Sequence, residues 1–216
     1  MKIEKKNIFE IENYFFQNCD ATRIPKFLIQ YEIFKKTISL NGEILELGVY
    51  KGNSILRFAT FKKIHCPHKS IYGFDTFDKF PKAKNKEDKI QRKKFILDAG
   101  INSISKNKLI KILKKKNCDK KVKLISGNVM NTLPKFCQKN KKIKISFLNL
   151  DLDMYEPSKV ALELLYPKLV KNGIILLDNF QSFFGETKAV KEFCKKKKIK
   201  VSKITFNNKS LFYIKK

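Results

Sequence analysis

Short apolar runs alternate with longer stretches of helical periodicity along most of the chain. Five runs, each followed by Gly, Asp or Ser, predict buried strands at residues 44–47, 70–74, 122–125, 144–150 and 174–177. Helical spacing predicts helices at residues 53–59, 100–116, 129–138, 156–169 and 185–194. The final runs, 201–206 and 211–214, flank Asn207 and Asn208 and predict a hairpin. The pattern therefore predicts an α/β fold: a seven-stranded, mostly parallel sheet with helices on both faces and an antiparallel C-terminal hairpin.

The first 40 residues lack this alternation. Residues 1–20 are polar with scattered aromatic side chains and predict an amphipathic helix, and residues 23–38 predict a second helix with Pro25 in its first turn. We therefore divide the chain into a helical lead-in, 1–40, and one domain, 41–216. Within that domain, the lysine-dense segment 76–100 is predicted to be a partly helical insertion that covers the strand ends as a lid.

Residues 43–54 combine an apolar run, a glycine turn and the start of a helix. Gly48 and Gly52 let the backbone turn tightly beside a ligand, and Asn53 or Ser54 is predicted to cap the helix. The Glu46 carboxylate at the strand end would repel a pyrophosphate but would accept a hydrogen bond from an ammonium group. This favours S-adenosylmethionine over NAD as the ligand. For this motif alone, a glycine turn that binds no ligand is the open alternative.

Acidic residues follow the other predicted strands. Asp75 ends the second strand, where nucleotide-binding α/β folds bind ribose hydroxyls. Asp151 and Asp153 follow the fourth strand, and Asp178 and Asn179 follow the fifth, so these side chains converge at one edge of the sheet. Their oxygen atoms suit Mg²⁺, Mn²⁺ or Ca²⁺. The alternative is that they only cap loops and helices.

The net charge of +28 first points to a polyanionic partner such as nucleic acid. However, only three of the 48 basic residues are arginines, Arg23, Arg57 and Arg92, whereas base recognition relies on arginine. The lysines are also spread along the whole chain. We therefore favour a solvated basic surface over a nucleic-acid site, and an anionic small substrate such as a nucleotide sugar stays compatible with the charge.

Three further features indicate a cytoplasmic protein. The chain contains no apolar run long enough to span a membrane, which needs about 18 residues. Residues 1–10 are charged and lack the apolar core of a signal peptide. The five cysteines are odd in number and widely spaced, as is typical of reduced intracellular thiols.

Taken together, these residues resemble the macrocin O-methyltransferase family of S-adenosylmethionine-dependent enzymes, which methylate hydroxyls of deoxysugars and related glycosides. The stretches that carry the resemblance are 23–35, 46–54, 73–81, 148–157, 164–180 and 185–193. The resemblance implies the Rossmann-like fold of class I methyltransferases and a Mg²⁺-assisted O-methyltransferase (EC 2.1.1.-). Its implied substrate is a deoxysugar, a nucleotide sugar or a glycoside.

The resemblance also implies roles by position. Asp153 would be the general base, and Asp151, Asp178 and Asn179 would hold Mg²⁺. The implied cofactor contacts lie in the glycine turn and at the neighbouring strand ends: Glu46, Gly48, Val49, Gly52, Asn53, Ser54, Asp75, Thr76, Gly127, Asn128 and Asp151.

Two asparagines depart from the family pattern. Asn179 stands where a second aspartate is usual, and Asn128 stands where Gly-Asp-Val is common. An amide oxygen can still bind Mg²⁺, but the site loses a negative charge and should bind metal more weakly. Two other functions stay open: a nucleic-acid methyltransferase and a non-catalytic basic binding module. The particular sugar and the oligomeric state, a homo-oligomer included, are not predicted.

Overall fold

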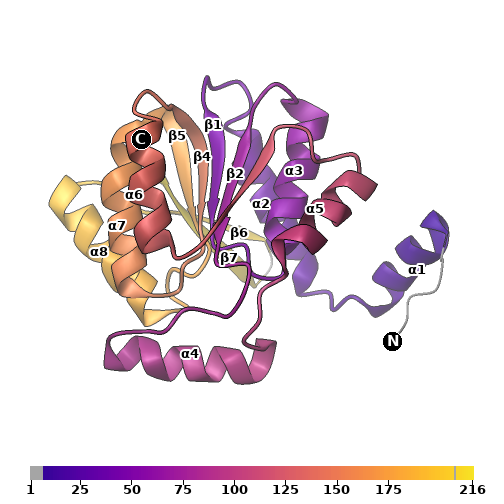
Figure 1. Ribbon diagram of the computed structural model, residues 1–216, viewed down its shortest axis with the longest axis horizontal. Coiled ribbons are helices and arrows are strands. Elements are labelled where there is room, and N and C mark those ends of the chain that lie inside the picture. Colours follow the sequence, from indigo (N-terminus) through magenta and orange to yellow (C-terminus); the bar gives the residue numbers. More distant parts are fainter. Residues whose placement is uncertain (1–6, 207) are drawn as a thin grey trace.

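A seven-stranded sheet with the order β3-β2-β1-β4-β5-β7-β6 organises the chain (Figure 1). The computed structural model describes residues 7–206 and 208–216. Its strands are β1 (Glu43–Leu47), β2 (Ile71–Asp75), β3 (Val122–Ser126), β4 (Ile145–Leu150), β5 (Leu169–Leu177), β6 (Ser202–Phe206) and β7 (Lys209–Lys215). Its helices are α1 (Ile8–Asn18), α2 (Arg23–Lys35), α3 (Asn53–His65), α4 (Lys86–Ala99), α5 (Lys106–Lys115), α6 (Val129–Lys139), α7 (Tyr155–Leu165), the short 3-10 helix η1 (Tyr166–Lys168) and α8 (Phe184–Lys197). Residues 1–6 of the predicted lead-in and Asn207 of the predicted hairpin turn lie outside the described residues.

The strand pairing confirms the predicted fold class. Strands β1 to β5 pair in parallel, whereas β7 pairs antiparallel with both β5 and β6. The strand order reverses direction between β1 and β4, which are neighbours at the centre of the sheet. In open α/β sheets, ligands bind in the crevice at such a reversal, outside the carboxyl ends of the strands. The topology therefore points to the ends of β1 and β4.

Helices cover both faces of the sheet (Figure 1). On one face, α2, α3 and α5 bury side chains such as Phe34, Phe58 and Leu109 against the strands. On the other face, α6, α7 and α8 bury side chains such as Leu162 and Val190. Because β4 is buried along its whole length, these two cores hold the central strand ends rigidly in place.

The start of α3 differs from the prediction. Gly52, with φ +87°, is the N-cap residue, and neither Asn53 nor Ser54 caps the helix. The predicted cap is therefore wrong. Instead, the Ser54 hydroxyl donates a hydrogen bond to the Glu46 carboxylate, which removes it from the helix end. Glycine suits this N-cap because other residues adopt a positive φ only at a cost.

Two other element boundaries also differ. Helix α5 begins at Lys106 and not at residue 100, because Ser105 caps it by accepting from the Lys108 amide. Helix α7 ends at Leu165 and does not reach Leu169, which is instead the first residue of β5. The polar segment after Leu169 hid the start of this strand, whose pairing with β4 is irregular at that point.

Helix α1 stands away from the sheet (Figure 1). Asn7 caps it with a capping box, but none of its residues is buried. Ile8, Phe9 and Phe16 are exposed by 75%, 70% and 68%. The predicted lead-in helix thus forms over the described residues without packing an apolar face on the domain.

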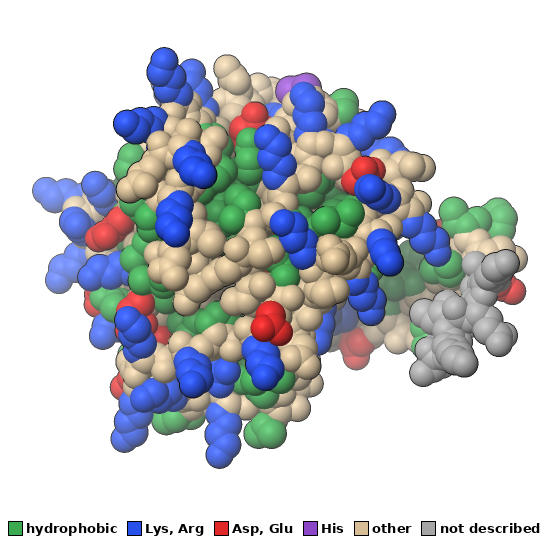
Figure 2. Space-filling model, viewed as in Figure 1, with side chains coloured by type: hydrophobic (Ala, Val, Ile, Leu, Met, Phe, Trp, Pro, Cys, Tyr) green, Lys and Arg blue, Asp and Glu red, His purple; other side chains and the backbone are tan. Residues whose placement is uncertain are grey.

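Lysine and arginine side chains are spread over the face shown in Figure 2 and do not form one compact patch. All five cysteines are free thiols. Cys19 is partly exposed, and the other four are buried. Burial raises the pKa of Cys66, Cys137 and Cys194. Among the described residues, no helix has the length and apolar character that crossing a membrane requires.

Candidate active site

A cavity of about 470 Å³ opens at the carboxyl ends of the parallel strands. It receives one residue from the end of each strand or from the turn that follows: Gly48, Asp75, Gly127, Asp151 and Asp178. Helices α2 and α4 close its sides. All of the predicted site residues line this cavity except Glu46 and Gly52.

The glycine turn after β1 lies directly against the loop after β4. Gly48 has φ +89°, and a Cβ atom there would lie 1.8 Å from the carbonyl oxygen of Asp151. The backbones are also tied together, because the Asp151 amide donates to the Leu47 carbonyl at 2.9 Å. Only glycine allows this close approach, so Gly48 lets the ends of β1 and β4 lie directly side by side at the cavity.

Asp75 fixes the shape of the turn. Its Oδ2 atom accepts hydrogen bonds from the amides of Val49 and Tyr50, each at 2.9 Å. Its Oδ1 atom accepts from the Phe77 amide and from the Ser103 hydroxyl, each at 2.8 Å. Asp75 thus holds the turn together while it lines the cavity, and its binding of ribose stays a prediction.

Glu46 is fully buried beneath Ser54, which lines the cavity. Its Oε1 atom accepts from Ser54 and, at 3.3 Å, from the Asn149 amide, whereas its Oε2 atom has no partner. Burial raises the Glu46 pKa to about 8. A buried carboxylate oxygen without a donor is costly, and an ammonium group would satisfy it.

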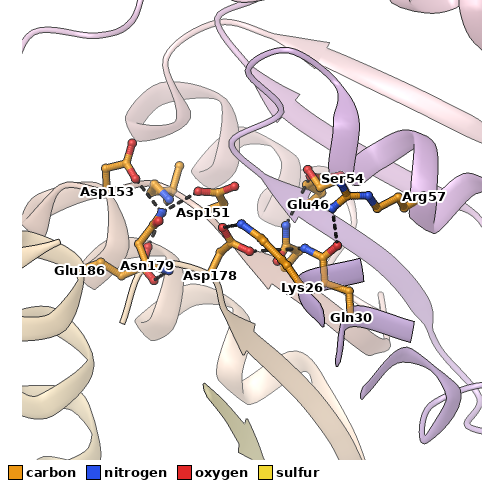
Figure 3. Close-up of polar contacts among 12 residues, drawn as sticks. Lys26, Gln30, Glu46, Ser54, Arg57, Asp151, Asp153, Asp178, Asn179 and Glu186 are labelled. Atoms are coloured by element: carbon orange, nitrogen blue, oxygen red, sulfur yellow. Dashed lines mark hydrogen bonds and ion pairs between the residues drawn. The ribbon is translucent and has the colours of Figure 1, made fainter. Parts of the chain in front are cut away.

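A second cluster combines the ends of β4 and β5 (Figure 3). The Asn179 side-chain amide donates to Oδ1 of Asp151 and to Oδ1 of Asp153, both at 2.6 Å. The Asn179 backbone amide donates to Oε1 of Glu186 at 3.0 Å, and the Leu152 amide donates to Oε2 of Glu186 at 3.3 Å. Asn179, in the loop after β5, thus joins three acidic side chains: two from the loop after β4 and one from α8.

Asp178 faces α2 instead. Its Oδ2 atom lies 2.6 Å from the Lys26 ammonium, and its Oδ1 atom accepts from the Gln30 amide at 3.4 Å. Gln30 in turn accepts from Arg57 at 2.9 Å (Figure 3). Burial opposes the charge on Lys26, but Asp178 and Asp151 outweigh it and raise the Lys26 pKa.

Burial and mutual repulsion keep protons on the acidic cluster. Burial, and after it the charge of Asp178, raises the pKa of Asp153 to about 7 and that of Asp151 well above its usual range. Burial and the neighbouring Asp153 raise the pKa of Glu186 to about 8. Asp153 also has φ +61°, a left-handed conformation that costs free energy and is concentrated at functional sites.

The profile of the macrocin O-methyltransferase (TylF) family matches residues 30–215. The chain belongs to the macrocin O-methyltransferase family. It is therefore an O-methyltransferase, as the sequence predicted, and membership in the family implies S-adenosylmethionine as the methyl donor.

Solved structures share the macrocin O-methyltransferase fold seen here. Calicheamicin methyltransferase CalS11 has a TM-score of 0.79 and 21% identity, with 99% of this chain and 87% of CalS11 covered. An apo structure, described as CalS11, TDP-rhamnose 3'-O-methyltransferase, has a TM-score of 0.70 and 22% identity over 99% of this chain and 88% of that one. The O-methyltransferase NovP has a TM-score of 0.73 and 20% identity, covering 88% of this chain and 78% of NovP. No curated protein matches the chain.

The cavity of this macrocin O-methyltransferase family member suits S-adenosylmethionine. Gly48 lines the cavity without a side chain, and the unpaired oxygen of Glu46 would accept from the amino group of the cofactor. Asn128 caps α6, because its side-chain oxygen accepts from the Met130 amide at 2.9 Å. The cofactor contacts otherwise stay predictions.

The predicted metal ligands do not fit Mg²⁺ in the same way. Lys26 and Gln30 already pair with Asp178, and Asn179 directs its N–H groups at Asp151. Within the described part of the chain, no group of three His, Cys, Asp or Glu side chains is arranged to hold a metal ion. Mg²⁺ binding therefore stays a prediction, and the hydrogen bonds of its predicted ligands do not support it.

Sequence reasoning missed three residues that shape the site: Lys26, Gln30 and Glu186. Arg23, Lys26 and Gln30 line the cavity and are spaced three and four residues apart, which places them on one face of α2. That spacing was the available signal, but it was hidden among abundant lysines.

Proposed function

We propose that the chain transfers the methyl group of S-adenosylmethionine to a hydroxyl of a sugar, with Asp153 as the general base. The observation that carries the proposal is the placement of the Asp153 carboxylate, which lines the cavity beside the glycine turn and has a pKa of about 7. A general base is most effective when its pKa is close to the working pH.

The reaction needs an acceptor oxygen that loses its proton as it attacks. When bound, S-adenosylmethionine supplies the methyl group, whose bond to sulfur breaks as the bond to oxygen forms. Asp153 would take the hydroxyl proton, and Asn179 holds that carboxylate in place at 2.6 Å. The products are a methyl ether, S-adenosylhomocysteine and a protonated Asp153.

The substrate class rests on the family and on the charge of the cavity. CalS11 is described as a TDP-rhamnose methyltransferase, which makes a nucleotide sugar or a related glycoside our proposed substrate. Arg23, Lys51, Lys82 and Lys84 line the cavity and would attract a diphosphate. The sequence also predicted assistance by Mg²⁺. We propose a transfer that does not use Mg²⁺, because the oxygen atoms of its predicted ligands are already paired.

For the cofactor we propose the contacts inferred from the sequence. The glycine turn would contribute Glu46, Gly48, Val49, Gly52, Asn53 and Ser54, and the strand ends would contribute Asp75, Thr76, Gly127, Asn128 and Asp151. Calorimetric titration with S-adenosylmethionine tests this first. Absence of binding would contradict the catalytic proposal and favour the non-catalytic binding module.

The role of Asp153 is tested by Asp153→Asn. We expect kcat/KM to fall by about 10²–10⁴-fold with the cofactor Kd unchanged, because only proton transfer is lost. In the wild type, kcat/KM should fall as the pH drops below about 7, since Asp153 then becomes protonated. Glu163→Gln, on the exposed side of α7, is the matched control. Full turnover by Asp153→Asn would overturn the assignment.

A further inference from the structure

Lys26 is the cation that lies nearest to the acidic strand ends. It extends from α2 to the end of β5, where its Nζ atom lies 2.6 Å from Oδ2 of Asp178. The Lys26 side chain is 21% exposed and that of Asp178 is 5% exposed, so the pair is largely shielded from water. Asp151 is the second carboxylate whose charge acts on Lys26. The ammonium group is thus paired at the end of β5, and the charge of Asp151 acts on it from the end of β4.

The hydrogen-bond donors around Asp178 and Asp151 leave little room for a divalent ion. Mg²⁺ needs about six oxygen ligands in near-octahedral geometry. Both oxygens of Asp178 face N–H groups, from Lys26 and from Gln30. Oδ1 of Asp151 faces an N–H group of Asn179 at 2.6 Å. These groups repel a metal ion instead of binding it.

The orientation of the Asn179 amide supports this arrangement. Its nitrogen lies 2.6 Å from carboxylate oxygens of both Asp151 and Asp153. The reversed amide would place its oxygen against the same two carboxyl groups, where only a proton carried by Asp151 or Asp153 could satisfy it. Asn179 therefore acts here as a donor to acids, whereas a metal ligand must offer its oxygen.

Charge balance points the same way. An asparagine at position 179 removes one negative charge that an aspartate would bring, and Lys26 adds one positive charge. Three aspartates then remain at the two strand ends, Asp151, Asp153 and Asp178. The Lys26 ammonium offsets part of their charge where it pairs with Asp178.

We propose that Lys26 takes the place of a divalent cation, so that this chain binds no metal between β4 and β5 and methylates its acceptor without one. Resting on the proposed function, this makes Lys26 a positioning residue. Its ammonium holds the Asp178 carboxylate in place at the cavity that both residues line.

Metal binding is tested directly by Mn²⁺ titration followed by electron paramagnetic resonance. The wild-type chain should bind no stoichiometric Mn²⁺ up to about 1 mM. Lys26→Met should gain one Mn²⁺ site, with a Kd at least about tenfold below that of the wild type, because the carboxylates near Lys26 lose their cation. A second change, Asp178→Asn, should abolish that site. Lys35→Met, an exposed lysine on the same helix, is the matched control and should behave as the wild type.

Turnover gives the second measurement. Wild-type activity should survive EDTA, Lys26→Met should lose activity and regain part of it with Mg²⁺, and Lys26→Arg should stay metal-independent. One equivalent of Mn²⁺ bound by the wild type and lost in Asp178→Asn would overturn the proposal. So would a folded Lys26→Met that gains no site. If Lys26→Met does not fold, the Mn²⁺ titration of the wild type and the turnover of Lys26→Arg in EDTA still test the proposal. Mn²⁺ binding is measured without methyl transfer. It therefore tests the proposed role of Lys26 even if the proposed function is wrong.

Discussion

Glu46 is a carboxylate with no exposed surface and with one oxygen that has no hydrogen-bond partner. Such a group destabilises the folded state unless something satisfies it. Its pKa of about 8 means that it is mostly protonated at pH 7. Pairing with the ammonium group of a bound cofactor would favour the ionised form, so Glu46 would have to release its proton.

We therefore predict that S-adenosylmethionine binding at pH 7 releases up to about one proton per site. Calorimetry in two buffers with different ionisation enthalpies measures this number. Glu46→Gln should release none and should bind more weakly, whereas Glu163→Gln should match the wild type. The release should vanish above about pH 9, where Glu46 is ionised before binding. Equal heats in both buffers at pH 7 would contradict the role of Glu46.

Lys26 shows why single residues were hard to predict. The acids at the strand ends were found because they follow apolar runs in the sequence. The partner of Asp178, however, lies 152 positions away on another helix, and nothing local distinguishes Lys26 from the other lysines. Pairing of this kind depends on how α2 packs against the sheet, which periodicity does not specify.

Among the elements, the turn between β1 and α3 depends on the loop after β4. Gly48→Ala should destabilise the protein in denaturant unfolding, because its Cβ would lie 1.8 Å from the Asp151 carbonyl oxygen. Gly100→Ala is the matched control: it has a similar φ, +87°, but its nearest neighbour is 4.0 Å away. The control should cost about 1–3 kcal/mol from backbone strain alone. Gly48→Ala should cost at least about 2 kcal/mol more.

Helix α4 is the lid predicted from residues 76–100, and we propose that role for it. Asp88 is its only buried residue. Oδ2 of Asp88 accepts from the Tyr155 amide, at the start of α7, at 2.9 Å. A Cβ atom on Gly185 would lie 2.1 Å from the other Asp88 oxygen, so α8 has to offer a glycine there. Asp88 is thus the buried attachment of the lid, and Gln91 and Phe95 add contacts at its surface.

Asp88→Ala should therefore loosen α4 without unfolding the sheet. We expect hydrogen exchange over residues 86–99 to accelerate by about tenfold, while β4 keeps its protection. Asp98→Ala, an exposed residue of the same helix, should change neither. Faster exchange throughout the chain would instead mean that Asp88 supports the whole fold.

Apolar patterning predicted the five parallel strands and the C-terminal hairpin, because buried strands need continuous apolar runs. It was less accurate at element ends. The end of α7 and the start of β5 were misplaced because Leu169 continues the helical spacing of apolar residues. Capping and strand pairing decide such boundaries, and both depend on neighbours in space.

At the scale of the whole molecule, the net charge is +28, and on the face shown in Figure 2 the basic side chains are spread out. Such a spread of lysines attracts anions, and we favour a solvated basic surface over a nucleic-acid site. The basic residues around the cavity thus add to the positive charge of the whole protein. Selectivity for the substrate must therefore come from the side chains inside the cavity.

Helix α1 contributes little to the stability of the domain, because none of its residues is buried. We predict that a chain starting at Asp20 unfolds within about 1 °C of the full chain. Differential scanning calorimetry of the two chains measures the difference. A drop of more than about 5 °C would show that α1 stabilises the domain, through contact with it or with a second copy.

The positions of the cysteines allow the motion of α1 to be measured in the native protein with a thiol label. Four cysteines are buried in the domain, and only Cys19, at the junction between α1 and α2, is partly exposed. A nitroxide or fluorescent maleimide should therefore attach at one place without any cysteine being removed. The label would sit at the hinge itself, where its rotational freedom would report whether the helix swings independently or becomes immobilised when substrate arrives.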